Sequence, residues 1–392
     1  MHFMIARASA ARIRSLATQF PVVVITGARQ SGKTTVIQAL FPELPYVNLE
    51  RPDVLEKALD DPRGFLDNFP GGRAIIDEAQ RFPQLPSWLQ AVVDENPVPG
   101  RFFLTGSNQP LLKSQIVQSL AGRAAYLHQT PFDSCELSGI SGTPSRMEEW
   151  LFKGFYPPLY DRPFDPVEWF AQYVSTYLER DLTQLIQVKD LRSFHRFLRL
   201  CAGRTGQVLN LSDLARDADV SHTTVKHWLS VLEASFLVFF LPPWHENFQK
   251  RLIKSPKLYF YDVGLAGYLA GISEEKQWET HPLRGPFFET MVVSDLIKKS
   301  SSAPQRSEWF FWSNPGGQEV DLIEVCGNSV QAYEIKSGAT FRPDHLKNLQ
   351  AWGYLAGLEP DKLHLIYAGK EAMVHRGISI TPWRDAKIFL DR

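Results

Sequence analysis

The stretch VVVITGARQSGKTT, residues 22–35, constrains the fold of this chain more than any other segment. A run of apolar, mostly β-branched residues predicts a buried strand, and it leads directly into GARQSGKT, which has the G-x-x-x-x-G-K-T spacing of a phosphate-binding loop. Glycines let backbone N–H groups turn inward around phosphate, and the N-terminus of the following helix adds a positive dipole end. We therefore expect a nucleotide site made of Gly27, Ala28, Arg29, Gln30, Ser31, Gly32, Lys33, Thr34 and Thr35.

Downstream of this loop, the segment RAIIDEAQ predicts a second apolar strand that ends in Asp77 and Glu78. We expect Lys33 to neutralise the β- and γ-phosphate oxygens and the Thr34 hydroxyl to ligate Mg²⁺. Asp77 is then placed to hold the same Mg²⁺ through water, and Glu78 to polarise the attacking water. We expect the two strands to lie side by side in one parallel sheet and to point at the same phosphate. In the alternative, Asp77 is only a helix N-cap.

A third apolar strand, GRFFLTGSN, delivers Thr105, Ser107 and Asn108 to its C-terminal end, and of these we expect Asn108 to orient the attacking water. Helix-length segments separate the strands expected so far, which begin at Val22, Tyr46, Ala74 and Phe102. This alternation is typical of an α/β fold with a parallel P-loop sheet. ATP is the expected ligand and substrate, with Mg²⁺ as its cofactor.

The order of these elements resembles the AAA superfamily of ATPases. The phrase LAGRAAYLHQTPFDSCELSG narrows the resemblance to a prokaryotic group whose C-terminal domain was long labelled of unknown function. In that group an LAGR follows the polar strand, which makes Arg123 a candidate arginine finger for a neighbouring subunit of a homo-oligomer. The alternative for Arg123 is an ordinary salt-bridging arginine. FKGFYPPLYDRP around residue 157 and YLERDL at residues 177–182 extend the resemblance over most of the chain.

Composition indicates an ordinary folded protein of two or three domains, with 392 residues, 44% of them hydrophobic and 22% charged. Lys and Arg total 42 against 43 for Asp and Glu, so no net field draws the chain to nucleic acid or membrane. Cys135, Cys201 and Cys326 form no CxxC pair, which suits a reducing compartment, and we expect the cytoplasm. The apolar run at residues 234–241 is too short to span a membrane, and we expect no membrane partner.

We expect three domains: an ATPase domain over residues 1–150, a helical linker and winged helix-turn-helix region over 151–280, and a C-terminal domain over 281–392. In the middle region, VLNLSDLARDADVSHTTVKHWLSVLEASFLVFFLPPW predicts a helix, a tight turn, a second helix capped by Ser221, and an apolar strand. On a DNA-reading module, the major groove would face the early positions of the second helix, including His222, Thr223 and Lys226. The alternative is a lid or a protein-binding unit.

Two basic segments in the middle region suit contact with the phosphate backbone of DNA or RNA. VKDLRSFHRFLRLCAGR predicts an amphipathic helix with an apolar face of Leu191, Phe194, Leu198 and Cys201. Its basic stripe consists of Lys189, Arg192, Arg196 and Arg199. The second segment is KRLIKSPK, residues 250–257. The alternative for such charge runs is a solvated helix face.

The C-terminal region predicts a helix, GPFFETMVVSDLIKK, that carries Glu289, and then three strands, SEWFFWSN, QEVDLIEVC and SVQAYEIKSG. Residues 327–328, Gly-Asn, are expected to form the hairpin turn between the last two strands. Strand alternation predicts Val320 and Leu322 on one face of the second strand, and Glu319, Asp321 and Ile323 on the other.

Asp321 followed by Glu334-x-Lys336 across this hairpin resembles the site of restriction-endonuclease-like nucleases. The resemblance implies that Asp321 and Glu334 bind a second Mg²⁺, that Lys336 assists the hydrolytic water, and that Glu289 serves as an additional acid. The segments RPDHLKNLQAWGYL and KLHLIYAG predict the helix and strand that complete an α/β/α domain. The alternative is a charged hairpin with Lys336 and Glu334 paired on its surface.

Together these features predict a protein that hydrolyses ATP and couples its nucleotide state to nucleic-acid binding or processing. The alternative is a nucleotide-switched interaction protein whose nuclease-like domain binds a partner or DNA without cleaving it.

Overall fold

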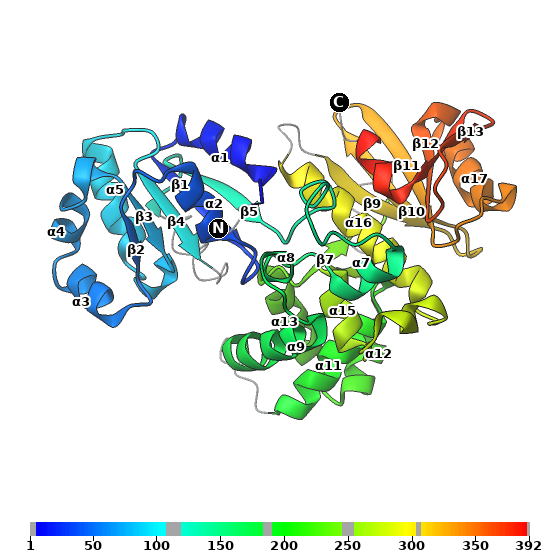
Figure 1. Cartoon of the computed structure of the whole chain (residues 1–392), viewed down its shortest axis with the longest axis horizontal. Coiled ribbons are helices and arrows are strands. Elements are labelled where there is room, and N and C mark those ends of the chain that lie inside the picture. The colour runs from blue at the N-terminus through cyan, green and yellow to red at the C-terminus, as the bar shows by residue number, and fades with distance from the viewer. Residues whose placement is uncertain (1–4, 107–118, 183–189, 245–254, 303–306, 390–392) are drawn as a thin grey trace. The chain divides into compact units, whose positions relative to one another are not determined.

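The chain forms two compact units, Met1–Phe132 with Ala234–Phe236, and Asp133–Glu233 with Leu237–Arg392. The computed structural model describes residues 5–106, 119–182, 190–244, 255–302 and 307–389 (Figure 1). Among the helices in these ranges, none combines the length and the apolar character needed to cross a lipid bilayer. The three-domain division expected from the sequence stays a prediction.

A five-stranded parallel sheet in the order β2-β3-β4-β1-β5 forms the centre of the first unit. Its strands are β1 (Val22–Gly27), β2 (Tyr46–Asn48), β3 (Ala74–Asp77), β4 (Phe102–Gly106) and β5 (Ala124–Gln129). The expectation that the P-loop strand and the strand ending at Asp77 are neighbours was wrong, because β4 lies between β1 and β3. Every residue of β4 is buried, as a strand covered on both faces and paired on both edges must be.

Helices cover both faces of this sheet. They are α1 (Ser9–Ala17), α2 (Lys33–Leu40), α3 (Pro52–Asp60), α4 (Pro62–Asp67) and α5 (Leu85–Glu95), with short 3₁₀ turns at Pro70–Gly72 and Ala79–Arg81. Val23 and Ile25 of β1 pack in the same core as α1 and α2, whereas Val22 and Val24 pack in the core of α3, α4 and α5. This strict alternation makes an α/β/α sandwich, and the parallel strands bring their carboxyl ends to one edge.

The second unit begins with a group of helices and a small antiparallel sheet whose first strand lies between two of them. The helices are α7 (Met147–Lys153), α8 (Pro158–Asp161), α9 (Pro166–Tyr173), a π-helix over Val174–Leu182, α11 (Leu191–Gly203), α12 (Leu211–Ala218) and α13 (His222–Ala234). The strands, in the order β6-β8-β7, are β6 (Gln207–Val208), β7 (Val238–Leu241) and β8 (Lys257–Phe260). The Ser221 hydroxyl accepts a hydrogen bond from the Thr224 amide at 3.0 Å, which is the expected cap of α13.

The connector between α7 and α8, residues 154–157, packs into this unit. Phe155 and Tyr156 are fully buried. The carboxylate of Asp262 accepts one hydrogen bond from the Phe155 amide at 2.6 Å and another from the Leu265 amide at 2.8 Å. Gly154 has a φ of +66°, and a Cβ on it would lie 2.5 Å from Asp262 Oδ1, so this position requires glycine.

A six-stranded mixed sheet in the order β13-β14-β12-β11-β10-β9 forms the C-terminal part of the unit. Its strands are β9 (Glu308–Ser313), β10 (Glu319–Cys326), β11 (Ser329–Lys336), β12 (Leu363–Tyr367), β13 (Met373–His375) and β14 (Ile378–Pro382). The helical elements are α15 (Val263–Leu269), α16 (Arg284–Ser302) and α17 (Lys347–Ala356), with 3₁₀ turns at Glu275–Glu279, Pro343–Leu346, Pro360–Lys362 and Trp383–Phe389. The turn between β10 and β11 is at residues 327–328, as expected.

The alternation predicted for β10 was wrong in part. Val320 and Ile323, three residues apart, lie in one hydrophobic core. The pairing of β10 with β9 shifts register between these two residues, and this irregularity reverses the alternation of faces along the strand.

Candidate nucleotide site and carboxylate cluster

The P-loop follows β1 at the carboxyl edge of the five-stranded sheet. Gly27 has a φ of +149°, and a Cβ there would lie 2.0 Å from the carbonyl oxygen of Gln129 on β5. Gly32 has a φ of +85° at the N-cap of α2, and Gln30 also adopts positive φ. The loop therefore needs its glycines for close backbone approach, which is the property that a phosphate cradle requires.

Lys33 at the start of α2 is held inside the loop. Its ammonium donates hydrogen bonds to the carbonyl oxygens of Gly27 at 3.1 Å and Ala28 at 2.8 Å. Burial lowers the pKa of Lys33 to about 8, although Glu78 and Asp77 act in the opposite direction. An anion bound in the loop would therefore stabilise the charged form of this lysine.

Asp77 at the end of β3 accepts hydrogen bonds at both carboxylate oxygens. Oδ2 accepts from the hydroxyls of Thr34 at 3.0 Å and Tyr46 at 2.8 Å. Oδ1 accepts from the Thr105 hydroxyl of β4 and from the Glu78 amide at 3.0 Å. Asp77 therefore connects the P-loop with three neighbouring strands, and its orientation is fixed by donors on each side.

These residues fit a Mg²⁺ ion. A hydroxyl can donate one hydrogen bond and has two lone pairs. The Thr34 hydroxyl donates its hydrogen bond to Asp77, so its lone pairs remain available to a cation. The Asp77 carboxylate lies next to that position. Hydroxyl, carboxylate and water oxygens are the ligands that Mg²⁺ prefers.

Glu78 is the other acid predicted at this edge. Its backbone is left-handed, with φ 54° and ψ 42°, which turns the residue away from the line of β3. Its carboxylate accepts a hydrogen bond from the Gln80 side-chain amide. Burial, and then the charge of Asp77, raise the pKa of Glu78. A buried carboxylate with a raised pKa is a stronger proton acceptor than an exposed one.

Sequence patterns missed several residues of this site, including Tyr46, Gln80 and Arg7. The Arg7 guanidinium donates to the carbonyl oxygens of Ser31 in the P-loop at 3.4 Å and Thr130 beyond β5 at 2.6 Å. Gln80 follows the acidic pair in the same segment but was given no role, whereas Tyr46 and Arg7 lie outside that segment and reach the site only through the fold. Thr105 was noted as a polar residue at a strand end, without a partner.

The other two residues predicted for hydrolysis are not part of this geometry. Asn108 lies outside the described residues. Arg123 precedes β5 at the amino edge of the sheet, where its guanidinium is paired with both carboxylate oxygens of Asp94. A role for Arg123 on its own subunit's nucleotide is therefore not supported by its position.

The basic residues predicted for nucleic-acid contact divide into accessible and buried ones. The exposed ones are Arg192, Arg196, Arg199, His222, Thr223 and Lys226. Lys189 and residues 250–254 lie outside the described ranges. Two expectations were wrong: Leu191 is half exposed instead of packing on the apolar face of α11, and Lys257 is buried against carboxylates, so it cannot contact phosphate.

The acids predicted for the C-terminal site do gather, and Glu319 joins them. Glu289 of α16 and Glu319 and Asp321 of β10 bring carboxylate oxygens within 4.8 Å of one another. We call these three residues, together with Glu334 of β11, the carboxylate cluster. The Lys336 ammonium pairs with Glu334 and lies 3.9 Å from Asp321. Glu334 is only 3% exposed, so the alternative of a surface pair is wrong.

Two further side chains from β8 enter this cluster, and no sequence pattern indicated them. The Lys257 ammonium lies 2.9 Å from Glu289 and 2.6 Å from Glu319, and the Tyr259 hydroxyl donates to Glu289. Burial alone would lower the pKa of Lys257, but the surrounding acids, Glu289 first, raise it well above its ordinary value. The cluster thus already contains a cation, and in this arrangement it does not fit a divalent metal.

Burial also alters the acids. It raises the pKa of Glu289 to about 7 and that of Glu334 to about 8, and the charge of Asp321 adds to both shifts. Both shifts favour the neutral, protonated form of these two carboxyls.

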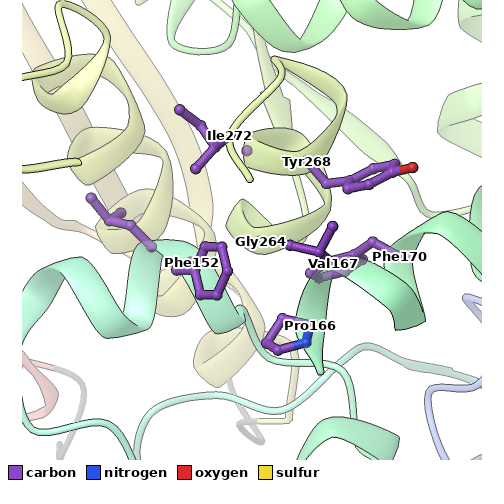
Figure 2. A pocket seen from close by; sticks show the side chains of 9 residues that line it. Phe152, Pro166, Val167, Phe170, Gly264, Tyr268 and Ile272 are labelled. Atoms are coloured by element: carbon purple, nitrogen blue, oxygen red, sulfur yellow. The ribbon is translucent and has the colours of Figure 1, made fainter. Parts of the chain in front are cut away.

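A pocket elsewhere in the second unit has no catalytic character. Figure 2 shows it between α7, α9 and α15, lined mainly by apolar side chains such as Phe152, Val167 and Phe170. It has no interior space for a water-sized molecule, and only the Tyr268 hydroxyl adds a polar side-chain atom to its lining. A pocket of this kind reflects packing between helices.

Comparison with known protein families identifies three segments. Residues 19–138 match a model described as an AAA domain, residues 145–276 match a domain of unknown function, DUF8612, and residues 284–385 match another, DUF4143. Among solved structures, the Walker-type ATPase of Pyrococcus abyssi is 15% identical and has a TM-score of 0.38, with 68% of this chain and 96% of that chain covered. The RuvB Holliday junction branch migration motor of Thermotoga maritima is 17% identical, with a TM-score of 0.33 and coverage of 61% and 90%.

Curated relatives extend over nearly the whole chain. Uncharacterized proteins of Mycobacterium tuberculosis and Mycobacterium bovis are each 32% identical over 370 residues, which is 93% of this chain and 80% of theirs. An uncharacterized protein of Methanocaldococcus jannaschii is 21% identical over 344 residues, covering 78% of this chain and 74% of its own. The chain therefore belongs to the family of these mycobacterial proteins, and its first unit is a P-loop ATPase domain of the AAA type.

Proposed function

We propose that this protein hydrolyses ATP in its first unit, with Mg²⁺ as cofactor. The observation that carries the proposal is the hydrogen bond from Thr34 to Asp77, because it joins the P-loop to the acidic end of β3 and leaves the hydroxyl's lone pairs for a cation. Bound Mg²⁺ would neutralise charge on the β- and γ-phosphates.

The chain's own residues would then divide the reaction between them. Lys33 exchanges its contacts with the loop carbonyls for the phosphate oxygens and neutralises charge on them. Glu78 takes a proton from the water that attacks the γ-phosphorus, while the bond to the β–γ bridging oxygen breaks and ADP leaves. Gln80 is hydrogen-bonded to the Glu78 carboxylate and positions it.

Two substitutions test this assignment. Lys33→Ala is expected to abolish ATP binding, measured with a fluorescent ATP analogue. Glu78→Gln keeps the shape of the side chain but cannot accept the proton, so it should bind ATP normally and hydrolyse it about 10²–10⁴-fold more slowly. Unchanged turnover in Glu78→Gln would remove Glu78 from the role of base.

We further propose that the second unit engages nucleic acid through a winged helix. The order α11, β6, α12, α13, β7 and β8, together with the sheet order β6-β8-β7, supports this fold for residues 151–280. The exposed polar face at the start of α13 and the exposed arginines of α11 supply groups for base and phosphate contacts. DNA and RNA are both candidates.

For residues 281–392 we propose a restriction-endonuclease-like domain. A helix bearing an acid, three antiparallel strands, a second helix and a parallel strand support it, as do Asp321, Glu334 and Lys336 at neighbouring positions of β10 and β11. The domain ranges are also supported by the separate family matches at 19–138, 145–276 and 284–385.

Lys257 favours the second candidate function, in which this domain binds DNA or a partner without cutting, because an ammonium already sits among the acids. Measuring the ATPase rate with DNA, with RNA and with neither tests the coupling, and indifference to both would contradict it. A Mg²⁺-dependent cleavage assay on plasmid and single-stranded DNA separates the two candidates. Cleavage that disappears in Asp321→Ala would establish processing, whereas binding without nicks would establish the second candidate.

A further inference from the structure

Lys257 occupies an unusual position for a lysine. Its side chain is 2% exposed and its ammonium lies 2.9 Å from Glu289 and 2.6 Å from Glu319. The lysine belongs to β8 of the three-stranded sheet, whereas the acids belong to α16 and β10. A strand of one sheet therefore delivers the positive charge to a cluster built by a different part of the unit.

The ammonium lies where a divalent ion would have to bind. A Mg²⁺ ion needs carboxylate oxygens at about 2.0–2.1 Å, and an ammonium that already bridges Glu289 and Glu319 repels an ion that approaches the same oxygens. The acids are also engaged by other donors, since Tyr259 donates to Glu289 and the Ile335 amide donates to Asp321 at 2.7 Å. Lys257 thus opposes a metal by its charge and by taking one acceptor position on each of Glu289 and Glu319.

The cluster contains more acidic side chains than lysines. Its four carboxylates face two ammonium groups, those of Lys257 and Lys336. One oxygen of Glu334, a residue 3% exposed, has no hydrogen-bond partner among the described residues. Removing Lys257 would leave an uncompensated buried charge, which is unfavourable unless another cation replaces it.

We propose that Lys257 is an internal cation that occupies the carboxylate cluster in place of a metal ion, a state that we call closed. The cluster binds a divalent metal only when β8 withdraws this lysine. The inference rests on the proposed nuclease-like domain and not on ATP hydrolysis. It makes Lys257 a regulatory residue of that domain.

A connection exists through which the closure can respond to binding. The Thr205 hydroxyl, just after the arginine-bearing helix α11, is 2.9 Å from the hydroxyl of Thr290, which is next to Glu289 on α16. The Gly206 amide donates to the carbonyl oxygen of Leu258, which is next to Lys257 on β8. A ligand on α11 therefore acts on two elements that meet at the closed cluster.

Binding of Mn²⁺ by the full-length, nucleotide-free protein tests the proposal, with electron paramagnetic resonance to count bound ions. Asp321→Asn is the matched control, because an asparagine oxygen can still accept from the Ile335 amide while the charge is lost. Wild type and Asp321→Asn should bind equal amounts of Mn²⁺, since the cluster is closed in both. One additional ion in the wild type would overturn the proposal, and this comparison does not require any Lys257 variant to fold.

Lys257→Met should open the cluster. We expect it to gain one Mn²⁺ per chain with a dissociation constant at least about tenfold below that of the wild type. The gain should vanish in Lys257→Met/Asp321→Asn, and Lys257→Arg, which keeps the cation, should gain nothing. A folded Lys257→Met that gains no ion would refute the closure. ATP turnover is measured separately on the same proteins, so a failure of the proposed hydrolysis would not be mistaken for a failure here.

Discussion

At the scale of single residues, the nucleotide site depends on Asp77 because other residues hold its carboxylate on both sides. Thr34 and Tyr46 donate to one oxygen, and Thr105 and the Glu78 amide donate to the other. A carboxylate has about four lone-pair positions, so these donors fix its plane as well as its place. Groups that orient an acid beside a metal affect the metal almost as strongly as a direct ligand does.

Tyr46→Phe removes one of these donors without changing the bulk of the ring. We expect the Mg²⁺ concentration needed for half-maximal ATP hydrolysis to rise about tenfold or more, because Asp77 loses a donor that fixes its orientation. Tyr354→Phe is the matched control, since Tyr354 is 88% exposed on α17. A Mg²⁺ titration of turnover that is the same in all three proteins would show that the phenol does not position Asp77.

Residues within the local motifs could be predicted, and residues that join them from elsewhere could not. Lys33 and Thr34 are fixed by the loop spacing, and Asp77 and Glu78 by the apolar strand before them. Tyr46 on β2 reaches Asp77 only because β2 pairs with β3, a fact that no local pattern carries. The same holds for Lys257, whose position in a basic run suggested exposure.

At the scale of elements, Asp262 joins the connector to α15, because one carboxylate oxygen accepts from the Phe155 amide and the other from the Leu265 amide. Asparagine has one acceptor oxygen, so in Asp262→Asn an NH₂ group must face one of the two amides. We expect the second unit to lose about 2–4 kcal/mol in free energy of unfolding, measured by urea titration of tryptophan fluorescence. Asp165→Asn is the matched control, since within the described ranges Asp165 caps α9 by accepting from one amide, that of Glu168. Equal losses in the free energy of unfolding of the two variants would contradict the assignment of two accepted hydrogen bonds to Asp262.

The difference in stability between wild type and Asp262→Asn should depend on pH in one direction. Burial raises the pKa of Asp262 above its ordinary value, against the opposing charge of Lys298. A carboxyl with a raised pKa in the folded state contributes stability below its unfolded pKa of about 4 and loses it as pH rises through the folded pKa. The stability gap between wild type and Asp262→Asn should therefore widen as pH falls from 7 towards 4. A gap that narrows over this range would mean that the folded pKa is not raised.

Element boundaries were easier to predict than element order. Most predicted strands and helices exist, because their apolar periodicity is local. The insertion of β4 between β1 and β3 was missed, since adjacency in a parallel sheet depends on packing that distant residues decide together. The register shift in β10 was missed for the same reason, because Val320 and Ile323 share a face only in the paired strand.

At the scale of the whole molecule, the position of Arg123 bears on assembly. Arg123 precedes β5, and its carbonyl oxygen accepts from the Val22 amide at the start of β1. The P-loop begins at the other end of β1, roughly 17 Å away at 3.3 Å per residue. An arginine at that edge cannot reach the γ-phosphate of its own subunit, so a finger role requires a neighbouring subunit.

Mixing two inactive variants tests this role. Arg123→Ala should reduce turnover by about 10³-fold or more if Arg123 acts as a finger, and Glu78→Gln removes the base. In an equimolar mixture, an intact base on one subunit meets an intact finger on the next at roughly one quarter of the interfaces, so activity should return. Asp94→Ala is the control, because it removes the ion pair while Arg123 remains. If the mixture stays inactive, or if Asp94→Ala loses as much turnover as Arg123→Ala, then Arg123 acts only through its pairing with Asp94.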